Sequence, residues 1–68
     1  MPERLVNRLR EERARLNLTQ AELATMVEVS RKTINTVENG VFIPSTVLAL
    51  RLARALGRSV ESLFQLPE

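Results

Sequence analysis

The feature that most constrains this chain is the three-residue interval between two short helices. Thr19 and Glu22 have the spacing of a capping box, in which each side chain satisfies a backbone amide of the other residue, so a helix begins there. Ser30 is the next N-cap, and only Glu28-Val29-Ser30 separates the two helices. Because three residues are too few for a flexible linker, the sequence predicts a tight turn that packs one helix against the other.

A further helix is expected in front of this pair. Leu9 and Leu16 fall near helical spacing. The helix could begin at Pro2, or after Asn7 acting as its N-cap. Asn7 is preferred, because Leu5-Val6 then forms an extended lead-in.

The remaining helices are marked by their starts and stops. Asn39-Gly40 ends the helix that Ser30 opens, since both residues tolerate the left-handed conformation. The next helix starts at Pro44 or Ser45 and ends at Gly57. Ser59 caps a last short helix through Leu63 and Phe64. The pattern therefore predicts five helices in a single domain over residues 1–68.

Composition excludes most catalytic chemistry. The chain has no Cys and no His, so it lacks disulfides, thiolate nucleophiles, and the commonest metal ligand and general base. Glu11 and Glu12 are adjacent and point in different directions on a helix, so they do not form an acid–base pair. We therefore expect no enzyme activity, no cofactor, no metal and no small-molecule ligand.

No segment is long and apolar enough to span a bilayer, and Met1-Pro2-Glu3-Arg4 lacks the apolar run of a secretory signal. We therefore expect a cytoplasmic protein with no membrane partner. The net charge of +2 is modest, but nine of the ten basic residues are Arg. Arg suits bidentate contacts to phosphate or guanine.

The helix that follows Ser30 carries the candidate binding residues. Ile34 and Val37 point inward, which leaves a polar outer side: Arg31, Lys32, Asn35 and Thr36. Two cations in a first helical turn oppose the helix dipole, which favours an anionic partner over simple solvated charges. Asn and Thr are mediocre helix formers, which is consistent with a surface selected for recognition.

The ordered motifs resemble the Cro/C1-type (XRE) helix-turn-helix family over about residues 7–66. They are Leu18-Thr19-Gln20-Ala21-Glu22-Leu23-Ala24, Val29-Ser30-Arg31-Lys32-Thr33-Ile34-Asn35, Val37-Glu38-Asn39-Gly40, Pro44-Ser45, and residues 48–57. The resemblance implies an all-α, five-helix lambda-repressor-like DNA-binding domain whose helix-turn-helix unit spans residues 19–39. It also implies a homodimer that binds palindromic operators in double-stranded DNA.

The resemblance and the helix positions together assign roles to residues. The residues expected to face bases are Arg31, Lys32, Asn35 and Thr36. Those expected at the DNA backbone are Thr19, Gln20, Ser30, Thr33 and Asn39. Gln20 could instead be a simple helix-start residue. The family counterparts of Arg13 and Glu38 pair across helices, so a structural ion pair is preferred to a phosphate-binding Arg13. Glu28 departs from the family by occupying a turn position that is usually Gly.

The end of the chain offers a dimer surface. Val60, Phe64 and Leu66 cluster where little sequence remains to cover them. Leu5-Val6 could pair with Phe64-Gln65-Leu66 as a short ribbon that completes this surface. The alternative is that Phe64 folds back onto Leu5 and Leu56 and closes the core of one subunit.

The sequence therefore predicts a transcriptional regulator that recognises a specific operator. A repressor acting by occlusion is the simpler hypothesis, because no effector domain is visible. The competing hypothesis is a protein-interaction module of the same fold, such as part of an antitoxin or a coactivator. A DNA reader needs the outer side of the second helix of the pair to be free and cationic, whereas an interaction module would tolerate its neutralisation.

Overall fold

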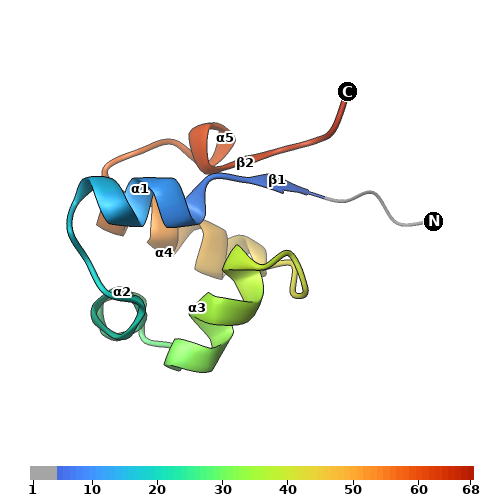
Figure 1. Ribbon diagram of the computed structural model, residues 1–68. Coiled ribbons are helices and arrows are strands. Elements are labelled where there is room, and N and C mark those ends of the chain that lie inside the picture. The colour runs from blue at the N-terminus through green and yellow to red at the C-terminus, as the bar shows by residue number, and fades with distance from the viewer. Residues whose placement is uncertain (1–4) are drawn as a thin grey trace.

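The computed structural model describes residues 5–68, which form five short helices and a two-stranded ribbon. The elements are β1 (Val6–Asn7), α1 (Leu9–Arg15), α2 (Gln20–Val27), α3 (Arg31–Glu38), α4 (Thr46–Leu56), α5 (Val60–Leu63) and β2 (Phe64–Gln65). The ribbon lies at one end of the molecule, and the turn between α2 and α3 lies at the other (Figure 1). The predicted helical fold with a ribbon from the chain ends is confirmed.

Side-chain caps begin four of the five helices. In each case a hydroxyl oxygen accepts a hydrogen bond from the backbone amide three residues later, and the residues are Thr19, Ser30, Ser45 and Ser59. Glu22 completes the predicted capping box with Thr19. At the helix ends Gly40 and Gly57 adopt the left-handed conformation, whereas Asn39 does not, with φ −85°. Local capping therefore defines where most of the helices begin.

The first helix begins later than the sequence predicts. Asn7 belongs to β1, and Arg8 is the N-cap of the helix. Arg8 makes no side-chain capping bond, because a guanidinium group has no hydrogen-bond acceptor. Asn7 still serves the helix start, since its Oδ1 accepts a hydrogen bond from the amide of Leu9 at 3.2 Å. Its Nδ2 donates to the carbonyl of Val37 at 2.8 Å and so attaches the strand to α3. The alternative start at Pro2 lies outside the described residues.

The two ends of the described chain pair as antiparallel strands. Val6 lies opposite Gln65, and Asn7 lies opposite Phe64. The amide of Arg8 extends the pairing by donating to the carbonyl of Leu63 at 2.8 Å. Phe64 is therefore part of β2, where the sequence predicted the end of the last helix.

All five helices and β2 contribute to one apolar core. Its buried members are Leu9, Leu23, Ala24, Val27, Ile34, Val37, Leu48, Leu52, Leu56, Leu63 and Phe64. Ala24 is 3% exposed, and its small side chain allows α2 and α3 to approach closely. Phe64 is 8% exposed and partly buried Leu5 packs against the same core, so Phe64 closes the core of its own chain. The core holds α3 by its inner side only.

Candidate nucleic-acid interface

Helix α3 is anchored by one face and presents the other to solvent. Ile34 and Val37 are buried with 0% and 1% of their surface exposed. On the outer side of α3, two residues are half-buried, Thr33 and Thr36. Three are exposed: Arg31, Lys32 and Asn35. Side chains at the start of such a helix are the ones that approach base edges when a helix enters the major groove.

The turn between α2 and α3 is compact and partly strained. Glu28 ends α2 in the left-handed conformation, with φ 62° and ψ 42°. The amide of Val29 donates to the carbonyl of Ala24 at 3.0 Å, which closes the turn. The Ser30 hydroxyl oxygen accepts a hydrogen bond from the backbone amide of Thr33 at 3.1 Å. It also lies 3.0 Å from the hydroxyl oxygen of Thr33. The position where the family usually has Gly therefore needs a left-handed backbone, and Glu28 adopts it.

The cations at the start of α3 are not neutralised within the protein. Neither Arg31 nor Lys32 forms an ion pair with any residue of 5–68, and the first turn of α3 contains no acidic residue. By contrast, every Arg from α1 and its N-cap is paired with a carboxylate: Arg8, Arg10, Arg13 and Arg15. The free positive charge of this face is therefore concentrated at the start of α3.

Behind this face lies a buried carboxylate. The side chain of Glu38 has no exposed surface, and Arg13 Nε donates to its Oε2 at 2.7 Å. Arg10 Nε and Gln20 Nε2 donate to its Oε1 at 3.3 and 3.2 Å. Burial raises the pKa of Glu38, but the hydrogen bonds from Arg13, Gln20 and Arg10 outweigh it and the net pKa is lowered. The expected Arg13–Glu38 pair is thus the centre of a larger cluster.

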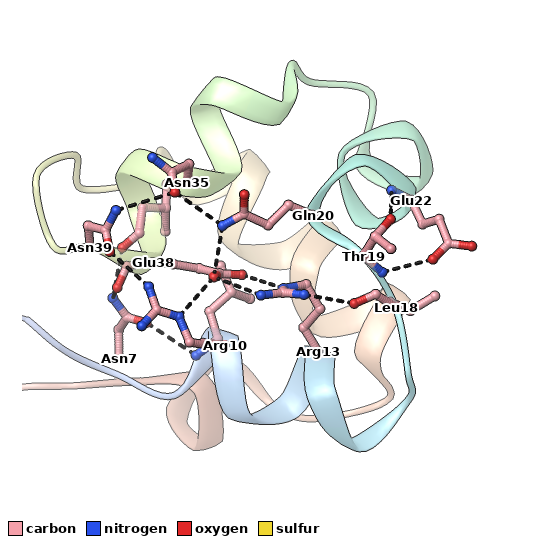
Figure 2. Close-up of polar contacts among 12 residues, drawn as sticks. Asn7, Arg10, Arg13, Leu18, Thr19, Gln20, Glu22, Asn35, Glu38 and Asn39 are labelled. Carbon is pink, nitrogen blue, oxygen red and sulfur yellow. Dashed lines mark hydrogen bonds and ion pairs between the residues drawn. The ribbon is translucent and has the colours of Figure 1, made fainter.

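The cluster continues outward to amide side chains on the candidate interface (Figure 2). Gln20 Nε2 also donates to Asn35 Oδ1 at 3.2 Å, and Asn39 Nδ2 donates to the same oxygen at 3.3 Å. Arg10 donates to Asn39 Oδ1 at 2.8 Å. Sequence reasoning missed Arg10, although it lies one helical turn before Arg13 and therefore on the same side of α1.

Thr36 and Thr19, like Ser30 and Thr33 in the turn, already use their hydroxyl groups within the protein. Thr36 donates to the carbonyl of Thr33 at 2.9 Å and is half-buried, which leaves its oxygen lone pairs and methyl group for a base. Thr19 accepts from the amide of Glu22 at 3.0 Å in the capping box. Both residues therefore have less freedom to adapt to DNA than Arg31 or Lys32.

The candidate dimer surface is only partly as the sequence suggests. Leu66 is 69% exposed and Val60 is half-buried, whereas Phe64 is largely buried in its own chain. These residues border an apolar groove lined by Leu5, Pro44, Thr46, Ala49, Leu50, Val60, Glu61, Phe64 and Leu66. Sequence reasoning missed Leu50, which is 57% exposed beside the buried stripe of α4. The sequence signal for an exposed leucine was the position of Leu50 outside the apolar stripe of Leu48, Leu52 and Leu56.

Comparison with known proteins assigns the family. The family model described as helix-turn-helix matches residues 9–63, which include the whole α2–turn–α3 unit and its supporting helices. The chain belongs to the XRE-type helix-turn-helix family. This XRE-type regulator is 52% identical over 61 residues to an uncharacterized HTH-type transcriptional regulator of Methanothermobacter thermautotrophicus, with 88% of each chain covered. It is 37% identical to the regulator YgzD of Bacillus subtilis, covering 91% of this chain and 94% of that one.

Solved structures agree with this assignment. The XRE-type fold superposes on the restriction-modification controller protein C.AhdI of Aeromonas hydrophila with a TM-score of 0.79 and 38% identity, over 84% of this chain and 86% of that chain. It superposes on the clp gene regulator ClgR of Corynebacterium glutamicum with a TM-score of 0.75 and 35% identity, over 79% of this chain and 57% of that chain. The chain is therefore a transcriptional regulator with a helix-turn-helix DNA-binding fold.

None of the helices in residues 5–68 has the length and apolar character needed to cross a membrane. The same residues contain no group of three or more acidic, His or Cys side chains arranged to hold a metal ion.

Proposed function

We propose that this XRE-type regulator binds a palindromic operator as a homodimer and represses transcription by occupying the site, without catalysis or a small-molecule ligand. The observation that carries the proposal is the exposed start of α3, where Arg31 and Lys32 lack any protein carboxylate among residues 5–68. Phosphate oxygens supply the missing negative charge, because neutralising phosphates releases the counterions condensed on DNA.

The contacts divide between bases and backbone. In this proposal α3 enters the major groove and its base-facing residues are Arg31, Lys32, Asn35 and Thr36. The starts of α2 and α3 offer backbone amides and hydroxyls to phosphates, through Thr19, Gln20, Ser30 and Thr33. Asn39 lies beside Asn35 at the end of α3, where it can reach the adjacent backbone.

The dimer is proposed to form at the end of the molecule away from the α2–α3 turn. The occupant of the apolar groove is a second copy of this chain, which would cover Val60, Leu66 and the exposed edge of Phe64. Leu50 adds to the apolar rim of the same groove. A single recognition helix reads only a few base pairs, and two-fold pairing places two such helices on half-sites about 34 Å apart. The location of the groove leaves α3 free for DNA.

The test is a gel shift on genomic DNA fragments at low and moderate salt. Replacing Arg31 and Lys32 by Ala should weaken binding to all sequences, because it removes two cations from the face that meets the DNA, and should reduce the slope of log affinity against log salt. Arg54→Ala is the matched control, because Arg54 is an exposed α4 arginine with no ion pair in residues 5–68. Equal binding by the double variant and wild type would favour a protein-interaction module instead.

A further inference from the structure

We propose that Asn35 presents only hydrogen-bond donors to the major groove and therefore selects a keto base, guanine or thymine. The inference rests on the proposed function, because it requires α3 to enter the major groove. It concerns the polarity of one contact, and the surrounding side chains determine that polarity through four hydrogen bonds.

The first constraint comes from the buried carboxylate of Glu38. An ionised carboxylate accepts hydrogen bonds and donates none. Gln20 lies 3.2 Å from Glu38 Oε1, so it must turn its NH2 group toward that oxygen. The same Nε2 lies 3.2 Å from the nearest side-chain atom of Asn35. Gln20 therefore offers a donor to Asn35.

The second constraint comes from the guanidinium group of Arg10. An arginine side chain donates hydrogen bonds and accepts none. Its terminal nitrogen lies 2.8 Å from Asn39, so Asn39 must turn its carbonyl oxygen toward Arg10. The NH2 group of Asn39 then faces Asn35 at 3.3 Å. Asn39 therefore offers Asn35 a second donor.

Two donors that meet at one side chain require an acceptor between them. Asn35 has a single acceptor atom, Oδ1, and both neighbours donate to it. Its Nδ2 is consequently on the other side of the amide, turned away from Gln20 and Asn39 (Figure 2). Asn35 is an exposed residue on the outer side of α3. In the proposed complex its NH2 group therefore faces the major groove.

An outward NH2 group distinguishes keto from amino bases. Guanine O6 and thymine O4 accept hydrogen bonds in the major groove, whereas adenine and cytosine carry amino donors at the corresponding position. The usual bidentate contact of Asn with adenine also requires Oδ1 as an acceptor. Here that oxygen already receives two hydrogen bonds, so Gln20 and Asn39 act as positioning residues for specificity.

The first experiment is selection from a randomised operator library with wild type and Asn35→Asp. The Asp side chain keeps one oxygen for Gln20 and Asn39 and turns the other outward as an acceptor. At one base pair in each half-site, the preferred base at the contacted position should change from guanine or thymine to adenine or cytosine. The ratio of the affinities for the keto and amino operators should change by about tenfold. An unchanged consensus would overturn the inference.

The second experiment identifies the contacted atom. Substituting 6-thioguanine or 4-thiothymine at that position replaces the keto oxygen by sulfur, a weaker acceptor. Binding should weaken severalfold for wild type and stay unchanged for Asn35→Ala. Equal sensitivity of the two proteins would contradict a contact from Asn35.

The positioning residues have a separate readout. Gln20→Met and Asn39→Ala release the Asn35 amide, so the ratio of affinities for the keto and amino operators should fall toward one, while thermal unfolding verifies the fold. An unchanged ratio would overturn their role. Failure of the wild type to bind any duplex would refute the proposed function itself, whereas duplex binding without these effects refutes only the inference about Asn35.

Discussion

Arg13 Nε lies 2.7 Å from Glu38 Oε2, and this pair joins α1 to the last residue of α3. The Glu38 side chain is fully buried, and that of Arg13 is only 17% exposed. Arg13 also donates to the carbonyl of Leu18 at 2.8 Å, so one guanidinium holds the α1–α2 connection and α3 together. The position of α3 is therefore supported by an ion pair on its inner side.

Arg13→Ala should lower the free energy of unfolding by about 3 kcal/mol, because it leaves a buried carboxylate without its main partner. Arg15→Ala should lower it less, since the Arg15 side chain is 39% exposed and its partners, Glu12 and the carbonyl of Leu56, do not include a fully buried charge. Arg8→Ala is the neutral reference, because its contact with Glu11 is 3.8 Å long and exposed. Urea unfolding measures all three variants, and equal midpoints for Arg13→Ala and Arg8→Ala would contradict the structural role of Arg13.

Stability should fall in acid, and Glu38 should account for much of the fall. Its pKa is lowered from the ordinary value of 4.5 because the hydrogen bonds from Arg13, Gln20 and Arg10 outweigh burial, which alone would raise it. A carboxyl group with a lowered folded-state pKa stabilises the fold above its unfolded-state pKa and loses this contribution as pH falls through the folded-state value. Urea midpoints should therefore be steady near neutral pH and drop below about pH 4.5.

Glu38→Gln tests that assignment. The variant should be less stable than wild type at neutral pH, yet show a flatter decline in acid, because it has no proton to bind at this position. Glu22→Gln is the comparison, since the pKa of Glu22 is also lowered, mainly by hydrogen bonds from Thr19, but at the surface. A Glu38→Gln variant with the same acid slope as wild type would mean that other carboxyl groups control the transition.

Glu28→Gly should stabilise the protein by about 0.5–1 kcal/mol, because a side chain with φ 62° carries left-handed strain that glycine lacks. Asn17→Gly is the matched control: Asn17 has φ 56°, but Asn tolerates this conformation better than Glu. Thermal unfolding should therefore show a larger gain at position 28 than at position 17. A loss of stability in Glu28→Gly would show that the Glu28 side chain makes a compensating contribution.

The proposed dimer should respond to charge placed on the groove rim. Leu66→Glu and Leu50→Glu should shift sedimentation at micromolar concentration toward the monomer, because both side chains are exposed beside the groove. Met26→Glu is the control, since Met26 is 50% exposed on α2 and does not line that groove. Phe64→Ala should instead lower stability first, as expected for a core residue. A monomeric wild type, even with excess operator half-sites, would exclude the dimer.

The helix boundaries were largely predictable because their causes are local. Thr19, Ser30 and Ser59 each cap a helix through a residue only three positions away, and Gly57 ends one by its own conformation. The inward face of α3 followed from the spacing of its apolar residues in the same way. These signals require no knowledge of the rest of the fold.

The cluster around Glu38 was only partly predictable because its members come from three helices and the residue after α3. The family resemblance pointed to Arg13, and the spacing of Arg10 places it on the same side of α1. Nothing in the sequence shows that Arg10 and Gln20 meet at the Glu38 carboxylate, or that Gln20 and Asn39 meet at the Asn35 amide. The start of α1 was missed for a similar reason. Asn7 is held in β1 by pairing with Phe64, so its backbone is part of the strand, although its side chain still accepts from the amide of Leu9.

The ribbon also bears on how the chain folds. The contacts between β1 and β2 join residues far apart in the sequence, such as Val6 and Gln65, so they raise the contact order of the fold. Closing so long a loop has a large entropic cost unless the intervening segments are already compact. The ends should therefore join late in folding, after α2, α3 and α4 have collapsed on one another. Once joined, they oppose fraying from either side and make unfolding more nearly all-or-none.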